Sequence, residues 1–481
     1  MLFNTMDYLL FLPIVVICYY LLPQKARYIW LLAASYYFYM QWNPVYIVLL
    51  FGCTVVTYFS ARFLEKNRAR STIMWLCVLL LLMVLAYFKY FDFLVEGINF
   101  ILKLIHLNPV QAKFSLLLPV GISFYTLQAL GYVIDVYRGE IPAERNFLRY
   151  ALFVSFFPQL VAGPIERSKN LLKQLSGHTF LDWDRFRKAI LLVLYGLFCK
   201  MVIADRIAIY VKKVYEQPGF FAGMYILVAA FLFSFQIYCD FYGYSTIARG
   251  SALLLGIELT DNFCAPYYSR TVKEFWRRWH ISLSTWFRDY VYIPLGGNRK
   301  GSLRKKLNLL LVLSISGLWH GASVSYILWG FLNGFYQVVG DAVSRWTGKE
   351  KRLSAEIFRV IRTFGLITFT WIFFAAGNLS NAVSILKYLL SVNISNWHVV
   401  FSGGLYTLGI SEEYFFILLL ALIILLCVDY LKYKGHDVAA CVLKQGWWFR
   451  VLCYITLIFA IILFGCYGEM YDTQQFIYFQ F

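Results

Sequence analysis

Two histidines occupy segments in which an imidazole could take part in proton transfer. His320 lies in residues 307–340, a run without Asp, Glu, Lys or Arg, and Gly317 and Gly321 flank it. An ionisable group inside an apolar segment is costly, which favours a functional role over packing. A neutral imidazole, with an ordinary pKa of roughly 6.5, suits a general base at neutral pH. The alternative is a buried neutral histidine that donates one hydrogen bond to a backbone carbonyl.

His280 lies in a strongly basic segment, residues 270–306, which holds ten basic and two acidic residues and therefore a net charge of +8. We predict a helix from Arg270 through His280 and onward, because the stretch lacks Gly and Pro and spaces its apolar residues by three and four. Such a helix places five polar residues on one face: Lys273, Arg277, His280, Ser284 and Arg288. This cationic face could bind lipid phosphates at the membrane surface, or it could lie beneath a cavity that receives an anionic donor.

The sequence predicts no metal site and no other common catalytic motif. The remaining histidines, His106, His178, His398 and His436, lie in predicted loops or interfacial segments, and no pair has the spacing of metal ligands. There is no nucleophile elbow, phosphate-binding loop or dinucleotide fingerprint, and the ten cysteines form no CxxC pair. We therefore expect no metal and no bound cofactor.

The composition identifies the class of protein that must position these residues. The 481 residues are 60% hydrophobic and 15% charged, whereas a soluble protein carries roughly 25% charged residues. The net charge of +18 favours contact with an anionic membrane face or an anionic ligand, and nucleic acid is not expected because the charge forms no separate basic arm. We predict an all-α, polytopic integral membrane protein embedded in the lipid bilayer.

Apolar runs of about 20 residues mark the membrane spans, and the period-2 alternation of a barrel is missing. We expect about 11 transmembrane helices, some broken or re-entrant at Pro and Gly, with further interfacial helices. The candidate runs are 3–22, 28–41, 45–63, 72–94, 115–136, 148–163, 187–210, 222–242, 307–319, 323–343, 362–377, 413–431 and 449–467. We expect a single membrane domain over 1–481, with N-terminal helices (1–110), a catalytic core (111–345) and C-terminal helices (346–481).

Basic loops predict the orientation of these spans. One side holds six basic residues if residues 42–44 form a tight turn between the second and third spans: Lys25, Arg27, Arg62, Lys66, Arg68 and Arg70. Lys and Arg are enriched in cytoplasmic loops, so this side should be cytoplasmic and the N-terminus extracytoplasmic.

Six sequence blocks together resemble the membrane-bound O-acyltransferases, in the bacterial branch that acetylates alginate, peptidoglycan and cellulose. They are PVGISFY (119–125), YVIDVYR (132–138), FPQLVAGPIER (157–167), DFYGYS (240–245), the stretch from Phe275 to Arg299, and LWHGA (318–322). The resemblance implies a multi-pass enzyme of the bacterial cytoplasmic (inner) membrane. It also implies acetyl transfer from cytoplasmic acetyl-CoA, across the membrane, toward an extracytoplasmic polysaccharide, with an SGNH-type acetyltransferase as partner.

The family carries two histidine positions, and these match His320, the principal catalytic residue, and His280. His320 is then the expected general base, while His280, a backbone N–H near Gly321, or Asn298 could polarise the thioester carbonyl. Four arginines and a lysine are expected to bind the phosphates of the donor, together with Asn298 in the donor site: Arg277, Arg278, Arg288, Arg299 and Lys300.

The C-terminal residues 476–481 resemble an aromatic motif of the same branch, in which a tyrosine relays the acyl group as an ester. Tyr478 is the candidate, and the alternative is an aromatic residue of the membrane interface. Two other functions stay open: D-alanyl transfer to teichoic acid from a carrier protein, and a polytopic transporter or flippase. The absence of an internal repeat counts against a transporter.

Overall fold

The helices of this chain form two compact units, which are described separately. The computed structural model describes residues 1–66, 71–110, 118–161, 163–221, 223–343, 352–391, 406, 408–467 and 477. Over these ranges the chain forms helices and no β-strand, so the predicted all-α class is confirmed. The first unit comprises residues 1–182 and 251–260, and the second comprises residues 183–250 and 261–481.

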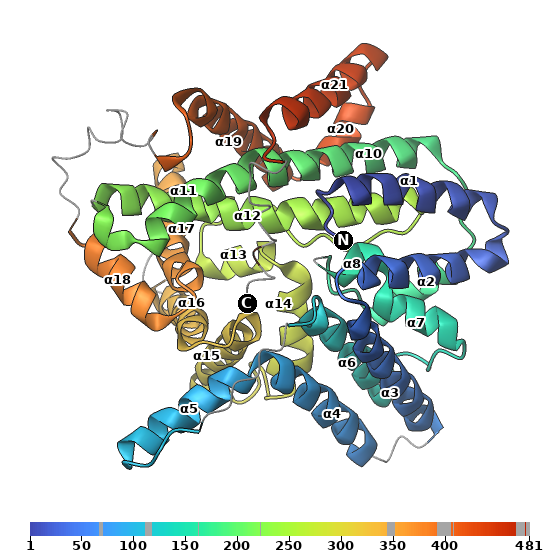
Figure 1. The fold of residues 1–481 in the computed structure, drawn as a ribbon, viewed down its shortest axis with the longest axis horizontal. Coiled ribbons are helices and arrows are strands. Elements are labelled where there is room, and N and C mark those ends of the chain that lie inside the picture. Colours follow the sequence, from blue (N-terminus) through green and yellow to red (C-terminus); the bar gives the residue numbers. More distant parts are fainter. Residues whose placement is uncertain are drawn as a thin grey trace. The chain divides into compact units, whose positions relative to one another are not determined.

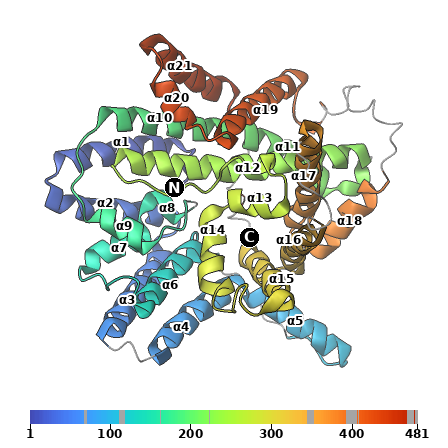
Figure 2. The same cartoon turned by 180° about the vertical axis from the view of Figure 1, so that it is seen from behind.

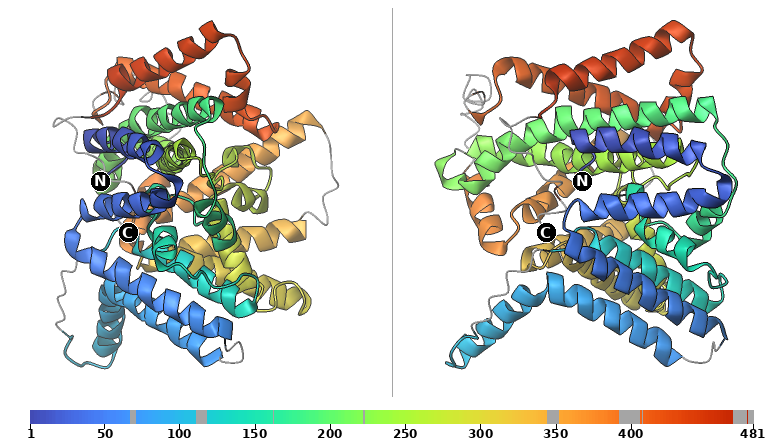
Figure 3. Two further views of the ribbon diagram at one scale, coloured as in Figure 1. Left: turned by 90° about the vertical axis from the view of Figure 1, so that its right-hand side faces the viewer. Right: turned by 45° about the vertical axis from the view of Figure 1, so that its right-hand side comes forward.

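The first unit is built from nine α-helices among its described residues (Figure 1). They are α1 (Met6–Leu21), α2 (Gln24–Met40), α3 (Ile47–Lys66), α4 (Ser71–Lys89), α5 (Phe91–Leu104), α6 (Ile122–Arg138), α7 (Phe147–Ser155), α8 (Phe157–Leu160) and α9 (Ser168–Leu175). Helix α6 packs against α3 and α4, and α2 packs against α7. Figure 3 shows α3 and α4, in two shades of blue, running side by side.

The predicted span over 148–163 is broken, as Pro158 indicated. Helix α7 ends at Ser155 and α8 begins at Phe157, and the Phe157 N–H donates to Ser35 Oγ at 3.1 Å instead of to a carbonyl of α7. A proline one residue into α8 suits the start of a helix and not its interior.

The second unit holds both candidate histidines, and Figure 2 shows its helices from behind. Its helices are α10 (Trp183–Leu197), α11 (Asp205–Glu216), α12 (Gly223–Leu254, continuing into the first unit), α13 (Val272–Arg278), α14 (Ile281–Phe287), α15 (Gly301–His320), α16 (Val324–Val343), α17 (Leu353–Ala375), α18 (Leu379–Leu389), α19 (Glu412–Tyr433), α20 (Val438–Leu443) and α21 (Trp447–Phe464). A π-helical segment, Phe198–Ala204, joins α10 to α11, and a second one, Arg288–Tyr292, follows α14.

Glycines let α10 and α12 approach closely in this unit, and Figures 1 and 2 both show the two helices side by side. A Cβ atom on Gly196 would lie 2.7 Å from the Gly243 carbonyl oxygen, and one on Gly250 would lie 2.8 Å from that of Ala189. No side chain fits at such distances. Helix α12 is therefore held firmly, and Asp240 and Phe241 in its middle have fixed positions.

Six of the described helices are long and apolar enough to cross a membrane. They are Pro44–Lys66, Ser71–Lys89, Gly223–Leu254, Leu353–Ala375, Glu412–Tyr433 and Trp447–Phe464. Helix α21 lies beside α10 (Figure 3) and has no buried residue, and its Leu452, Phe459 and Ile462 are more than half exposed. Apolar surface of this extent is unsuited to water and fits a multi-pass membrane protein. The number of 11 crossings stays a prediction.

Candidate active site

His320 lies at the C-terminal end of α15, where the chain turns back into α16. A Cβ atom on Gly317 would lie 2.1 Å from the Tyr326 carbonyl oxygen, and one on Gly330 would lie 2.1 Å from that of Leu313. The two helices therefore touch backbone to backbone, which only glycine permits. Gly317, which flanks His320 in the sequence, thus makes this close approach possible. The hairpin holds His320 in a fixed place with 2% of its surface exposed.

Aromatic rings surround the His320 imidazole. Its centroid lies 5.0 Å from that of Trp319, 5.1 Å from Trp329 and 5.6 Å from Phe374, each in an edge-to-face arrangement. Trp329 in turn stacks on Trp371 at 5.4 Å. His320 therefore lies in an apolar environment, and a general base at this position would act as a neutral imidazole.

His280 interrupts the helix that the sequence predicts from Arg270 onward, and that prediction of a continuous helix is wrong. Helix α13 ends at Arg278, α14 begins at Ile281, and His280 between them is left-handed, with φ 44° and ψ 54°. A non-glycine residue in this conformation costs on the order of 1 kcal/mol. Such strain persists only where surrounding contacts impose it.

The segment 262–264 supplies those contacts. The Cys264 N–H donates to the Arg278 carbonyl and the Ile281 N–H donates to that of Asn262, both at 3.0 Å. The Asn262 Oδ1 atom accepts from the Ser282 N–H at 3.2 Å and from its hydroxyl at 2.6 Å. Asn262 thereby caps α14 from a distant point in the chain. These hydrogen bonds offset the strain and fix the backbone of His280.

The break brings the two histidines together. The His280 side chain is fully buried, and its ring lies edge-on to Phe241 at 4.6 Å and 6.3 Å from the ring of His320, measured between centroids. His280 lies in the junction between two short helices, outside the candidate membrane-spanning helices, and burial lowers its pKa well below the ordinary value. His280 is therefore suited to act in the neutral state.

A cavity of about 680 Å³ opens within the second unit, and neither histidine lines it, although Ile281 and Ser316 do. Four of the five residues expected on the cationic face line it, namely Lys273, Arg277, Ser284 and Arg288, although His280 does not. They still share one surface because α13 and α14 each keep helical spacing on their side of the break. Ser316 also lines the cavity, one helical turn before His320 on α15, so the cavity reaches the turn that carries this histidine.

The charges in the cavity are partly paired. Asp341 binds Lys305 at 2.9 Å and Lys273 at 3.3 Å, and the Arg288 Nε atom lies 2.7 Å from Asp289. Arg277 is exposed and forms no ion pair within the described part of the chain. Arg277 is thus the cation most available to an anionic ligand. The sequence analysis missed Lys305, Gln337 and Asp341 as lining residues, although Asp341 is the first charged residue after the charge-free run.

The structure does not bring all predicted donor-binding residues to the cavity. Asn298 lines it, and its Oδ1 atom accepts a hydrogen bond from the Tyr292 hydroxyl. Arg278 binds Glu274 and the Cys264 carbonyl, both at 3.1 Å, and its guanidinium lies over the Tyr433 ring. Arg299 and Lys300 are exposed just before α15 and do not line the cavity.

Tyr478 lies outside the described residues, but its neighbour Ile477 is described. The Ile477 N–H donates to Asp240 Oδ2 at 2.7 Å, while Asp240 Oδ1 binds Lys200 at 2.6 Å. Lys200 also binds Asp205 at 2.7 Å, and all three side chains are at least 95% buried. Asp240 precedes Phe241, whose ring contacts His280. The block at 240–245 thus links Ile477 to the histidine site, a role that its sequence did not reveal.

Comparison with known proteins assigns this sequence to a protein family. The sequence model of the membrane-bound O-acyltransferase family matches residues 140–376, which include both histidines. The chain is 40% identical to the probable alginate O-acetylase AlgI of Pseudomonas syringae pv. tomato over 374 residues, 77% of this chain and 71% of that protein. The chain belongs to the membrane-bound O-acyltransferase family.

Two further relatives indicate which branch of the family the chain belongs to. The chain is 36% identical to the peptidoglycan O-acetyltransferase of Helicobacter pylori over 428 residues, 82% of this chain and 80% of that protein. It is 30% identical to the teichoic acid D-alanyltransferase of Streptococcus thermophilus over 270 residues, 53% of this chain and 64% of that protein. This membrane-bound O-acyltransferase is therefore an enzyme of the O-acetylation branch, with a multi-pass membrane fold.

Proposed function

We propose that this O-acyltransferase takes an acetyl group from acetyl-CoA at the cytoplasmic face and passes it across the membrane for O-acetylation of an extracytoplasmic polysaccharide. The observation that carries the proposal is the pair of buried histidines, 6.3 Å apart, beside a cavity lined by cations. The relatives named for alginate and peptidoglycan acetylation support a polysaccharide as the final acceptor. The proposed location is the bacterial cytoplasmic (inner) membrane, with the N-terminus outside.

The cavity is the proposed binding site for the donor. Coenzyme A carries several phosphate charges, and Arg277, Lys273 and Arg288 supply positive charge along the cavity wall. Apolar lining residues such as Val312 and Leu313 suit the less polar arm that carries the thioester. With the phosphates at the cations, the thioester points along α15 toward Ser316 and the turn that holds His320.

His320 is the proposed general base. Its neutral imidazole takes the proton of the acceptor hydroxyl as the hydroxyl oxygen attacks the thioester carbonyl carbon. The tetrahedral intermediate collapses, the C–S bond breaks, and the leaving thiolate takes the proton back from the imidazolium. The products are an acetyl ester and free coenzyme A. His280 is the proposed partner that orients the thioester carbonyl or donates a hydrogen bond to it.

Tyr478 is the proposed first acceptor, which would hold the acetyl group as a phenyl ester before an SGNH-type partner passes it to sugar hydroxyls. Ile477, the residue before it in the sequence, is bound to Asp240, which precedes the residue that contacts His280. Mass spectrometry of the C-terminal peptide should find an added acetyl group after incubation with acetyl-CoA. Tyr478→Phe should abolish this adduct, and polysaccharide acetylation that continues in that variant would exclude the relay.

The donor can be tested directly against the nearest alternative. The purified protein in lipid nanodiscs should release coenzyme A from acetyl-CoA and should not react with a D-alanyl carrier protein. The reverse result would assign the chain to D-alanyl transfer, which the lower identity and shorter match to the D-alanyltransferases do not favour. No observation favours a transporter or flippase, and lipid-linked saccharide flux in liposomes without acyl transfer would be needed to support one.

A further inference from the structure

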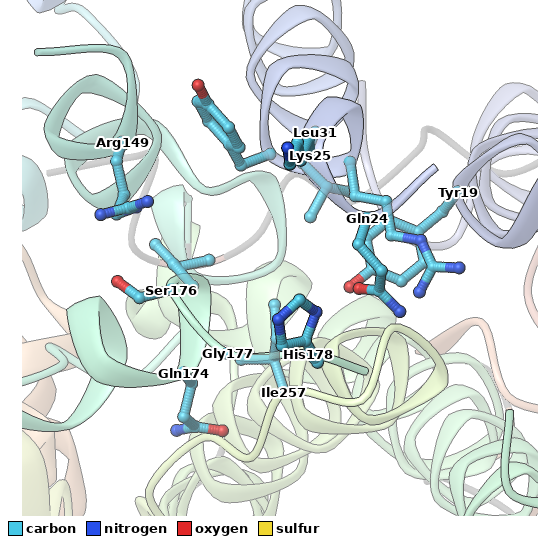
Figure 4. A pocket seen from close by; sticks show the side chains of 13 residues that line it. Tyr19, Gln24, Lys25, Leu31, Arg149, Gln174, Ser176, Gly177, His178 and Ile257 are labelled. Carbon is cyan, nitrogen blue, oxygen red and sulfur yellow. The ribbon is translucent and has the colours of Figure 1, made fainter. Parts of the chain in front are cut away.

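A second pocket, of about 330 Å³, lies within the first unit and has no part in the proposed acyl transfer. It is formed by the turn between α1 and α2, by α7, and by the end of α9 with the residues that follow it. Figure 4 shows Arg149 on one side of the opening, Gln24 and Tyr19 on the other, and His178 between them. Lys25 and Arg27 complete the polar lining.

The pocket is positively charged and lacks an internal counter-charge. Its lining residues include Lys25, Arg27, Arg149 and His178, and no Asp or Glu is among them. Within the described residues neither Lys25 nor Arg27 forms an ion pair, while Arg149 has one long contact, 3.6 Å, to Glu144. The N-terminal turn of α2, which begins at Gln24, adds the positive end of a helix dipole. Such a site attracts an anion.

Arg149 carries an unused donor at this site. Its Nε atom is buried and makes no hydrogen bond to any described part of the chain. The centre of the guanidinium lies 5.7 Å from the centroid of the Tyr28 ring. A buried N–H without an acceptor costs about 1–3 kcal/mol. An anionic oxygen in the pocket removes that penalty. Arginine is also the residue best suited to bind phosphate through two parallel hydrogen bonds.

The rim of the pocket identifies the kind of anion. Leu21 and Phe180, each close in sequence to lining residues, are 79% and 75% exposed, and Leu181 is 47% exposed. Tyr19 and Tyr28 line the pocket itself. Tyrosines and cations beside exposed apolar side chains are typical of the boundary between headgroups and acyl chains. On the proposed orientation this boundary is the cytoplasmic one, where anionic lipids concentrate.

We propose that this pocket binds the phosphodiester headgroup of an anionic phospholipid. Arg149 and Lys25 face the phosphate, and the acyl chains lie along the exposed apolar residues nearby. Arg27 adds positive charge to the pocket wall, where its guanidinium donates to the carbonyls of Leu22, Thr179 and Tyr20. The proposal is independent of the acyl-transfer chemistry, so either can fail without the other.

The test is native mass spectrometry of the delipidated full chain with added phosphatidylglycerol or phosphatidylcholine of the same acyl chains. The wild type should bind phosphatidylglycerol more tightly. Each cation near a membrane surface contributes about a fivefold gain in affinity. The double variant Lys25→Gln with Arg149→Gln should therefore bind phosphatidylglycerol about 25-fold more weakly, with phosphatidylcholine binding unchanged.

Two further variants serve as controls. One tests whether weaker binding comes from unfolding, and the other tests whether it comes from the change in net charge alone. Lys25→Gln replaces an exposed side chain without an ion pair among the described residues, so it should fold normally and lose about fivefold. Lys169→Gln with Lys173→Gln removes the same charge from exposed positions on α9 outside the pocket and should bind as the wild type does. Wild-type binding by the pocket variants would overturn the proposal. Displacement of the lipid by inorganic phosphate or coenzyme A would overturn it too, and would assign the pocket to a soluble phosphate.

Discussion

His320 and His280 are buried side by side, but the chain holds them in different ways. His320 ends a regular helix within a hairpin whose glycines bring two backbones into contact. His280 lies at a strained, left-handed junction that hydrogen bonds from Asn262 and Cys264 impose. One residue is positioned by local sequence and the other by a distant segment. The comparison suggests that His320 needs an exact depth in the protein, whereas His280 needs a particular orientation of its ring.

The largest expected effect is the loss of the proposed general base. His320→Ala should lower the rate of acetyl transfer about 100- to 10,000-fold, or about 3–5 kcal/mol of barrier, because the proposed proton acceptor is lost. Turnover of acetyl-CoA by the purified protein measures this rate, and immunoblotting of membranes measures how much of the variant is present. His436→Ala, at an exposed position, is the control and should remain active. If the His320→Ala protein is abundant and active, His320 is not the general base.

The chemical and conformational roles of His280 can be separated with asparagine. Asparagine tolerates the left-handed conformation, so His280→Asn should keep the junction between α13 and α14 while it removes the imidazole. We expect a loss of about 100-fold in kcat if the ring helps to polarise the thioester. The same assay and a thermal unfolding curve measure the two effects. Wild-type kcat in a stable His280→Asn protein would show that only the backbone at this position matters.

The hairpin that carries His320 should respond to a single methyl group. Gly317→Ala places a Cβ atom 2.1 Å from the Tyr326 carbonyl oxygen, so α15 and α16 must separate. Overpacking of this kind costs about 1–3 kcal/mol of stability. Gly340→Ala is the matched control on α16, because nothing lies within 4 Å of a Cβ atom there. Thermal unfolding in detergent should distinguish them, and equal melting temperatures would mean that the hairpin is looser than the structure shows.

Features that depend on neighbouring residues could be predicted from the sequence, whereas features imposed by distant residues could not. Apolar runs predicted the helical membrane fold, including two helices over 307–319 and 323–343 on either side of His320, because these features depend on neighbouring residues. The break at His280 escaped prediction because Asn262, which imposes it, lies outside the helical pattern and acts through hydrogen bonds. Helical spacing still predicted that Lys273, Arg277, Ser284 and Arg288 share a surface. It could not show that Arg278 turns toward Glu274 and Tyr433.

The smallest effect concerns the cations of the cavity, where the two arginines that end α13 differ. Arg277 lines the cavity, so Arg277→Gln should raise the KM for acetyl-CoA about three- to fivefold with little change in kcat, since an exposed charge contributes up to about 1 kcal/mol. The increase should shrink in high salt because exposed charges are screened.

Arg299→Gln is the control for Arg277→Gln, because Arg299 is exposed and does not line the cavity. Steady-state kinetics at two salt concentrations compare the variants. If Arg299→Gln raises the KM as much as Arg277→Gln does, the donor phosphates respond to the basic segment as a whole. An effect confined to Arg277→Gln would place them inside the cavity. The helix break at His280 would then separate a phosphate-binding helix from the buried ring that meets the thioester.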